Sequence, residues 1–124
     1  MHELSMAQGI LNAVIENAEK SGATEVKEVT IEIGKLAHLN PEQLKFLLDV
    51  LTEDTIAEGT EFIMEEIPIE IECDKCDYVG IAKGDDSDFY SPIVECPNCE
   101  NKFVNVTNGK DCIVKNIIIE KPDD

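Results

Sequence analysis

Apolar residues recur every three to four positions near the start of the chain. This spacing fits the 3.6-residue turn of an α-helix with one buried face. Ser21 and Gly22 follow the last of these residues, and glycine is well suited to ending a helix. The pattern predicts an amphipathic helix that begins near Glu3 and ends at Ser21. Its apolar positions are Leu4, Ala7, Leu11, Val14, Ile15 and Ala18.

A strand and a second helix are predicted next. Apolar and polar residues alternate over Val29–Ile33, which indicates a strand with one buried face that stops at Gly34. Asn40 is placed to cap a helix over residues 41–53, and Gln43 is placed to complete a capping box. Leucines line one face of this helix, at Leu44, Leu47, Leu48 and Leu51.

Two further stretches alternate in the manner of strands. The first covers residues 60–71, where Pro68 marks an edge or a bend because it has no N–H to donate. The second covers residues 111–120, and its isoleucines would pair most simply with the earlier strands. The segment from Cys73 to Lys110 has few aliphatic residues and contains the acidic linker GDDSDF. It therefore cannot build an ordinary hydrophobic core.

Four cysteines in this segment form two C-x2-C pairs separated by 19 residues. Such a pair turns both sulfurs toward one ion, and two pairs supply the four thiolates of a closed structural zinc site. An iron centre of the rubredoxin type shares this spacing, and redox or metal-relay chemistry is the less favoured role. The ligands are Cys73, Cys76, Cys96 and Cys99. The fifth cysteine, Cys112, lies in an apolar stretch and is expected to pack as a small hydrophobe.

These patterns predict an α+β fold. Two helices lie on a three-stranded, mainly antiparallel sheet with strands near residues 26–33, 60–71 and 111–120, and a zinc-ribbon-like lobe with four cysteines is inserted into it. We expect residues 1–70 plus 110–124 to form one domain. Residues 71–109 would form the inserted zinc-binding domain.

The charge of the chain disfavours some classes of binding partner. The chain has 27 acidic and 10 basic residues, and its formal net charge is −17. Every basic residue is a lysine. Without arginine and with so much negative charge, nucleic acid is a poor partner. No apolar run is long enough for a membrane span and no signal-peptide pattern is present, so we expect a cytoplasmic protein. A reducing compartment also favours metal over disulfides at the paired cysteines.

The first three residues offer a second metal site. The amine of Met1, the amide nitrogen of His2 and its imidazole can close fused chelate rings around one cation. Nickel and copper favour square-planar nitrogen coordination, whereas zinc and magnesium rarely displace amide protons. Glu3 adds a carboxylate in the first helical turn, where it offsets the repulsion between a cation and the helix N-terminus. By itself this triplet is weak evidence.

The whole chain resembles the HypA family of hydrogenase nickel-incorporation proteins. The resemblance rests on MHELS at the start, IEIGKL, TIAEG, the CDKC and CPNC pairs in order, and IVKNIIIE near the end. It implies a metallochaperone that binds nickel at Met1, His2 and Glu3 and holds structural zinc on the four cysteines. It also implies a partner GTPase, with which nickel is loaded into the large subunit of [NiFe] hydrogenase.

Some archaeal relatives in the family carry a further histidine between the cysteine pairs, whereas here no histidine follows His38. A fourth nickel ligand would come from the Glu3 amide, a carboxylate or water. A rival interpretation is a zinc-ribbon adaptor that docks on a partner protein and has no nickel role. An enzyme is disfavoured, because no paired nucleophile and base and no phosphate-binding GxxxxGK[ST] loop is present.

Overall fold

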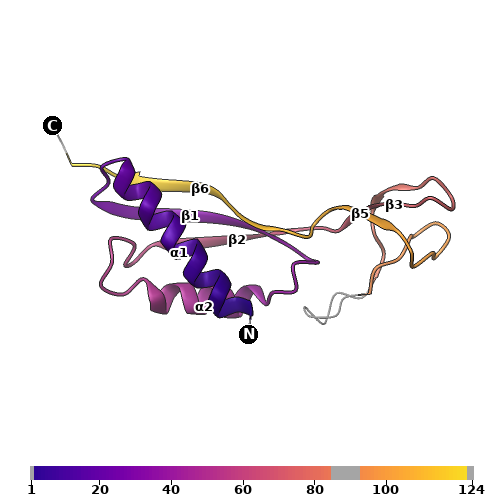
Figure 1. The fold of residues 1–124 in the computed structure, drawn as a ribbon, viewed down its shortest axis with the longest axis horizontal. Coiled ribbons are helices and arrows are strands. Elements are labelled where there is room, and N and C mark those ends of the chain that lie inside the picture. Colours follow the sequence, from indigo (N-terminus) through magenta and orange to yellow (C-terminus); the bar gives the residue numbers. More distant parts are fainter. Residues whose placement is uncertain (1, 85–92, 123–124) are drawn as a thin grey trace. The chain divides into compact units, whose positions relative to one another are not determined.

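The computed structural model describes residues 2–84 and 93–122 (Figure 1). The elements follow the order α1 (His2–Lys20), β1 (Glu25–Gly34), α2 (Pro41–Leu51), β2 (Glu61–Ile67), β3 (Glu70–Glu72), β4 (Val79–Ile81), β5 (Asn105–Asn108) and β6 (Cys112–Glu120). The strands form two three-stranded sheets, ordered β2-β1-β6 and β4-β3-β5. The predicted α+β class is confirmed, and the predicted strand over residues 60–71 is divided at Pro68 into β2 and β3.

The contacts divide the chain into two compact units. The helical unit comprises residues 1–31, 40–65 and 113–124, and the cysteine unit comprises residues 32–39 and 66–112. The predicted domain boundaries at 70/71 and 109/110 remain a prediction. The acidic linker GDDSDF lies almost entirely outside the described residues.

The C-terminal end of α1 and the start of α2 follow from local sequence. Gly22 adopts a left-handed φ of 75°, and the Ala23 N–H donates to the Ala18 carbonyl at 3.0 Å, which is the glycine C-cap expected of this sequence. Asn40 caps α2, since its side-chain oxygen accepts from the backbone N–H groups of Glu42 and Gln43 at 3.1 and 3.3 Å. The second helix ends at Leu51, slightly before the predicted residue 53.

The larger sheet has mixed strand directions. The Thr24 N–H donates to the Glu120 carbonyl and the Gly34 N–H donates to that of Asp111, so β6 runs antiparallel to β1 as expected. At the other edge the Thr60 hydroxyl donates to the Val26 carbonyl and the Lys35 N–H donates to the Ile67 carbonyl. Strand β2 therefore runs parallel to β1, because α2 returns the chain to the same end of the sheet. Within this sheet the β1–β6 pair has the predicted antiparallel direction and the β1–β2 pair does not.

The core of the helical unit lies between the helices and the sheet. Figure 1 shows α1 lying across the strands with its N-terminal end beside α2. Strand β1 is central in its sheet and buries Val29 and Ile31 completely. Apolar burial of this kind is the main stabilising contribution in a small domain. The other completely or almost completely buried apolar residues of this unit include Ala7, Val14, Ala18, Val26, Leu44, Leu48 and Ala57.

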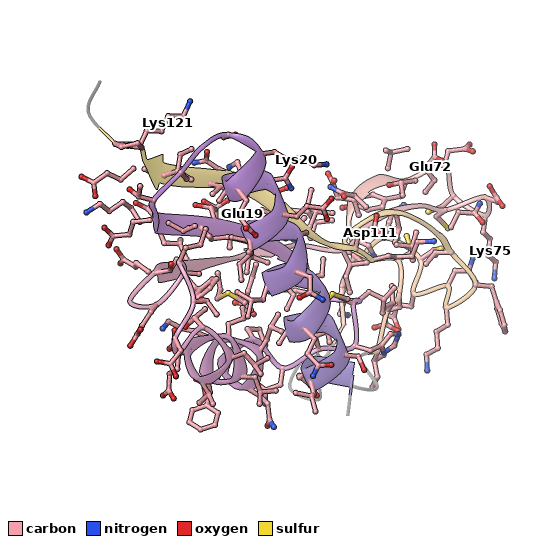
Figure 2. All side chains as sticks on the ribbon, turned by 60° about the vertical axis from the view of Figure 1, so that its left-hand side comes forward. Glu19, Lys20, Glu72, Lys75, Asp111 and Lys121 are labelled. Atoms are coloured by element: carbon pink, nitrogen blue, oxygen red, sulfur yellow. The ribbon has the colours of Figure 1, made fainter. Side chains whose placement is uncertain are left out.

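The surface carries lysines dispersed among carboxylates. Figure 2 shows Glu19 and Lys20 at the C-terminal end of α1, and Lys20 pairs with Glu16 at 3.2 Å. Lys45 pairs similarly with Asp49 at 3.0 Å. Exposed pairs of this kind contribute at most about 1 kcal/mol each, and they do not form the basic patch that nucleic-acid binding needs. Within the described residues, no helix is long and apolar enough to cross a membrane.

Gly34 is predicted to tolerate no side chain. A Cβ atom there would overlap the carbonyl group of Gly109, on the segment where the Leu36 N–H donates to the Gly109 carbonyl at 2.9 Å. Because both neighbours are backbone, we expect Gly34→Ala to lower the free energy of unfolding by about 3 kcal/mol. Urea denaturation would measure this loss.

Gly9 supplies the matched control for that substitution. It lies inside α1, and apart from its neighbours in the helix a Cβ atom there would meet nothing within 4 Å. Gly9→Ala should therefore stabilise the protein by about 0.5–1 kcal/mol, since alanine favours the helix. Equal and small effects of the two substitutions would contradict the close backbone approach at Gly34.

Candidate metal centres

The four predicted cysteines converge in the cysteine unit. Their sulfur atoms all lie within 4.8 Å of one another. The Sγ atoms of Cys73 and Cys99 are 3.7 Å apart, and those of Cys76 and Cys96 are 3.5 Å apart. A disulfide would bring two sulfurs to about 2.05 Å. The spacing is instead that of separate thiols that face a common centre.

This geometry fits a tetrahedral metal ion. Four sulfurs at about 2.3 Å from a zinc ion lie about 3.8 Å from each other, close to the two sulfur–sulfur distances given above. Four thiolates also suit iron, and in either case they leave no coordination position for a substrate. The arrangement can therefore hold a structural metal. Zinc is the better match to two C-x2-C turns in one small lobe.

The two turns that carry the cysteines have the same backbone geometry. In the first, the Asp77 N–H donates to the Cys73 carbonyl at 2.9 Å. In the second, the Glu100 N–H donates to the Cys96 carbonyl at 2.9 Å. Asp77 and Glu100 both have a left-handed φ of 62°, a conformation that is costly for residues other than glycine. Each turn therefore tolerates local strain in order to direct its two sulfurs inward.

The cysteines are also the centre of a small hydrophobic cluster. Cys73 and Cys96 are buried together with Ile69 and Ile71; Ile71 lies on β3, and Ile69 directly precedes this strand. Ile71 is held in the middle of the β4-β3-β5 sheet, because it is paired with Gly80 on β4 and with Val106 on β5. Half-buried residues pack around it: Leu36, Cys76, Tyr78, Ala82, Val94, Cys99, Val104 and Val106.

The pKa values of the Cys73 and Cys99 thiols differ, because their hydrogen bonds and burial differ. Burial opposes ionisation of Cys73, but hydrogen bonds from the backbone of Cys76 and Lys75 and from the side chain of Asn101 outweigh it and lower the pKa of Cys73 to about 6. A backbone hydrogen bond at Asn101 favours the Cys99 thiolate, but burial and the other three thiols raise the pKa of Cys99 to about 12. The cluster thus already favours negative charge on one sulfur, as a metal ligand requires.

At the N-terminus the structure describes His2 as the first residue of α1, while Met1 lies outside the described residues. Glu3 is only 3% exposed, and its carboxylate accepts a hydrogen bond of 3.0 Å from the Asn40 N–H. In a capping box that N–H would have bonded the Gln43 side chain, so Glu3 takes the place predicted for Gln43. No pattern in the sequence predicts this contact between the start of α1 and the cap of α2.

His38 and Cys112 do not join the cysteine cluster. His38 is exposed and has a left-handed φ of 59°. Cys112 begins β6 and is half-buried, and burial raises the pKa of its thiol. The expectation that Cys112 packs as a small hydrophobe stays a prediction.

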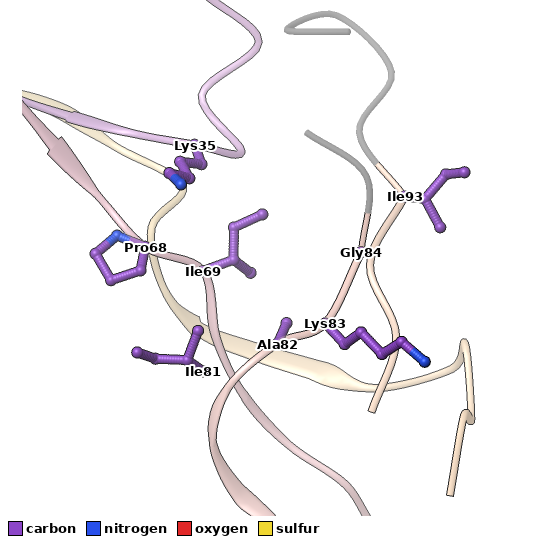
Figure 3. Close-up of a pocket in the computed structure, with 8 residues that line it drawn as sticks. All are labelled: Lys35, Pro68, Ile69, Ile81, Ala82, Lys83, Gly84 and Ile93. Atoms are coloured by element: carbon purple, nitrogen blue, oxygen red, sulfur yellow. The ribbon is translucent and has the colours of Figure 1, made fainter. Parts of the chain in front are cut away.

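The cysteine unit also has a shallow pocket (Figure 3). Its charged side chains are Lys35 and Lys83, and Lys83 lies 4.0 Å from Glu95. Aliphatic residues form most of the remaining wall, which offers no thiol, imidazole or carboxylate to a metal ion. The lining comprises Lys35, Pro68, Ile69, Ile81, Ala82, Lys83, Gly84 and Ile93.

Comparison with known proteins matches the chain to one family over nearly its full length. Residues 1–119 match the family described as hydrogenase/urease nickel incorporation, metallochaperone, hypA. The chain is 64% identical to the hydrogenase maturation factor HypA of Methanobrevibacter smithii, with 100% of this chain and 99% of that one covered. It is 53% identical to that of Methanothermobacter thermautotrophicus, with 99% and 100% covered. The solution structure of the Ni metallochaperone HypA from Helicobacter pylori has the same fold, with a TM-score of 0.66, 18% identity, and 97% and 98% covered.

Proposed function

Because the chain belongs to the HypA family of hydrogenase/urease nickel-incorporation metallochaperones, we propose that it binds Ni(II) through Met1, His2 and Glu3. It then delivers the ion, with a partner GTPase, to the large subunit of [NiFe] hydrogenase. The relatives named above support hydrogenase as the client, since they are hydrogenase maturation factors. A separate GTPase is needed because the chain has no phosphate-binding loop of its own.

The observation that carries this proposal is the start of α1 at His2. The first four N–H groups of a helix have no partner inside the helix. The amide nitrogen of His2 therefore can lose a proton to nickel without breaking an intrahelical hydrogen bond. Together with the Met1 amine and the His2 imidazole, the His2 amide closes two fused chelate rings and leaves one position of the square plane for a carboxylate or water.

Glu3 supports this site in a second way. Its buried carboxylate is held by the Asn40 N–H, so the first turn of α1 is fixed to the cap of α2. The negative charge also offsets the positive end of the α1 dipole, which otherwise repels a cation. We therefore assign to Glu3 a carboxylate that steadies the site.

The cysteine centre has a structural role in this proposal. Cys73, Cys76, Cys96 and Cys99 would hold Zn(II), supported by their sulfur spacing. Zinc with four thiolates is coordinatively closed, so it supplies folding stability and no reaction. Nickel, in contrast, would bind at a chain terminus, where a partner protein can reach the ion and displace its ligands.

An N-terminal extension tests the nickel site directly. Residues added before Met1 convert its amine into an amide and leave the rest of the chain unchanged. Calorimetric titration of the zinc-loaded protein with Ni(II) should show about one strong site per chain in the native form. The extended form should bind nickel at least about 100-fold more weakly, since a primary ligand matters more than the outer-shell groups whose loss costs 10–100-fold.

The other outcomes of this titration separate the rival functions. Equal binding by both forms would place the nickel site elsewhere and refute the terminal chelate. Binding by neither form would favour the zinc-ribbon adaptor, in which the first three residues have no role.

A further inference from the structure

Asn101 connects the two cysteine turns. Its backbone carbonyl accepts a hydrogen bond of 2.9 Å from the Cys96 N–H, which closes the second turn. Its side-chain Nδ2 lies 3.7 Å from the Sγ of Cys73 in the first turn, 28 residues earlier in the chain. One residue thus touches both halves of the metal centre.

The side-chain amide of Asn101 has a fixed orientation. Its Oδ1 accepts from the Phe103 N–H at 3.1 Å, and its Nδ2 donates to the Phe103 carbonyl at 3.2 Å. An amide that satisfies both backbone groups of one residue cannot be reversed without losing both bonds. The nitrogen, and not the oxygen, therefore faces the sulfur of Cys73.

The side-chain donor to Cys73 differs from the backbone N–H donors to the sulfurs, which come from the same turn as the cysteine that accepts them. Cys96 accepts from the backbone N–H of Asn98 at 3.4 Å, a bond within its own turn. Cys73 is only 3% exposed, so water is poorly placed to replace a lost donor. The backbone N–H groups of Lys75 and Cys76 would remain as donors, so loss of the Asn101 donor removes part of the compensation for desolvation of this sulfur.

We propose that Asn101 is a positioning residue of the cysteine metal centre, which donates its amide N–H to the Cys73 thiolate and thereby retains the metal ion. The inference rests on the proposal that the four cysteines hold zinc. Outer-shell hydrogen bonds orient metal ligands, and their removal typically costs 10–100-fold in metal affinity. The Asn101 amide also ties the two turns together, so its loss frees one turn to move away from the other.

Asn101→Asp is the sharpest test, because the two side chains have nearly the same shape. The substitution keeps an acceptor for the Phe103 N–H but replaces the donor to Cys73 with a carboxylate oxygen. We expect zinc transfer to the chelator 4-(2-pyridylazo)resorcinol to accelerate about 10-fold. Asn105→Asp is the matched control, since it adds the same charge in the same unit and its side chain bonds Asp74 rather than a sulfur.

Cobalt(II) spectra distinguish positioning from a general loss of stability. A thiolate without its N–H donor gives up charge more readily, so the sulfur-to-cobalt band should move to longer wavelength in Asn101→Asp and in Asn101→Ala, but not in Asn105→Asp. Faster zinc release with an unmoved band, or no change in either, would overturn the role of Asn101. Zinc content of the unmodified protein is measured first, and a protein without zinc would overturn both this inference and the proposed zinc site.

Discussion

The Cys96→Ala variant is expected to keep its helices but lose the folded structure of the cysteine unit. Cys73 and Cys96 make up half of the four buried residues in the cluster of this unit. Its strands are short, with three residues in β3 and in β4 and four in β5. Zinc contributes on the order of 10–16 kcal/mol to small zinc-binding peptides, far more than such a core supplies. Removal of one ligand should therefore unfold the unit.

Hydrogen exchange followed residue by residue would measure this effect. Amides of Ile71 and Val106 should lose protection in the variant, while those of Val14 and Leu48, in the core of the helical unit, should keep it. Zinc removal by a strong chelator should give the same pattern in the unmodified protein. Cys112→Ala is the control, because Cys112 lies outside the cluster. Retained protection at Ile71 without metal would show that the unit does not depend on zinc.

Features set by neighbouring residues could be predicted from the sequence. The period of α1, the Asn40 cap of α2 and the division of a strand at Pro68 depend on interactions within a few residues, so the local pattern contains them. The cysteine cluster could be predicted as well, because two C-x2-C turns have little other use in a short acidic segment. The structure confirms these parts of the fold and brings the four cysteines together, while their role as zinc ligands stays a prediction.

Contacts between distant segments could not be predicted. The parallel pairing of β2 with β1 depends on where α2 returns the chain, and apolar alternation is the same for either direction. Gly34 was expected only to stop a strand, although it also allows the backbone of Gly109 to approach. The contact of Asn101 could not be predicted either, since the sequence around a polar residue after a turn does not show which distant sulfur it will contact. Periodicity in one segment does not specify its partner.

His2→Ala is expected to remove strong nickel binding while zinc content and fold stay unchanged. The substitution deletes the only imidazole in the proposed site. The chelate ring between this imidazole and the His2 amide can then no longer form. We expect the affinity for Ni(II) to fall by more than about 100-fold, beyond the 10–100-fold range of outer-shell groups. Calorimetric titration of zinc-loaded protein would measure the affinity, and metal analysis would measure the zinc. His2 lies at the first position of α1, where an exchange for alanine favours the helix.

His38→Ala is the matched control, because the chain has only two histidines and His38 is exposed in a loop of the cysteine unit. It should bind nickel as the unmodified protein does. Glu3→Gln adds a third comparison: the amide oxygen can still accept from the Asn40 N–H, but the charge is gone. If the carboxylate acts by offsetting the helix dipole, this variant should weaken nickel binding by a smaller factor, about 3–10-fold for 0.6–1.4 kcal/mol of dipole and charge interaction. Nickel lost equally in the His2 and His38 variants would instead require a site built from both histidines.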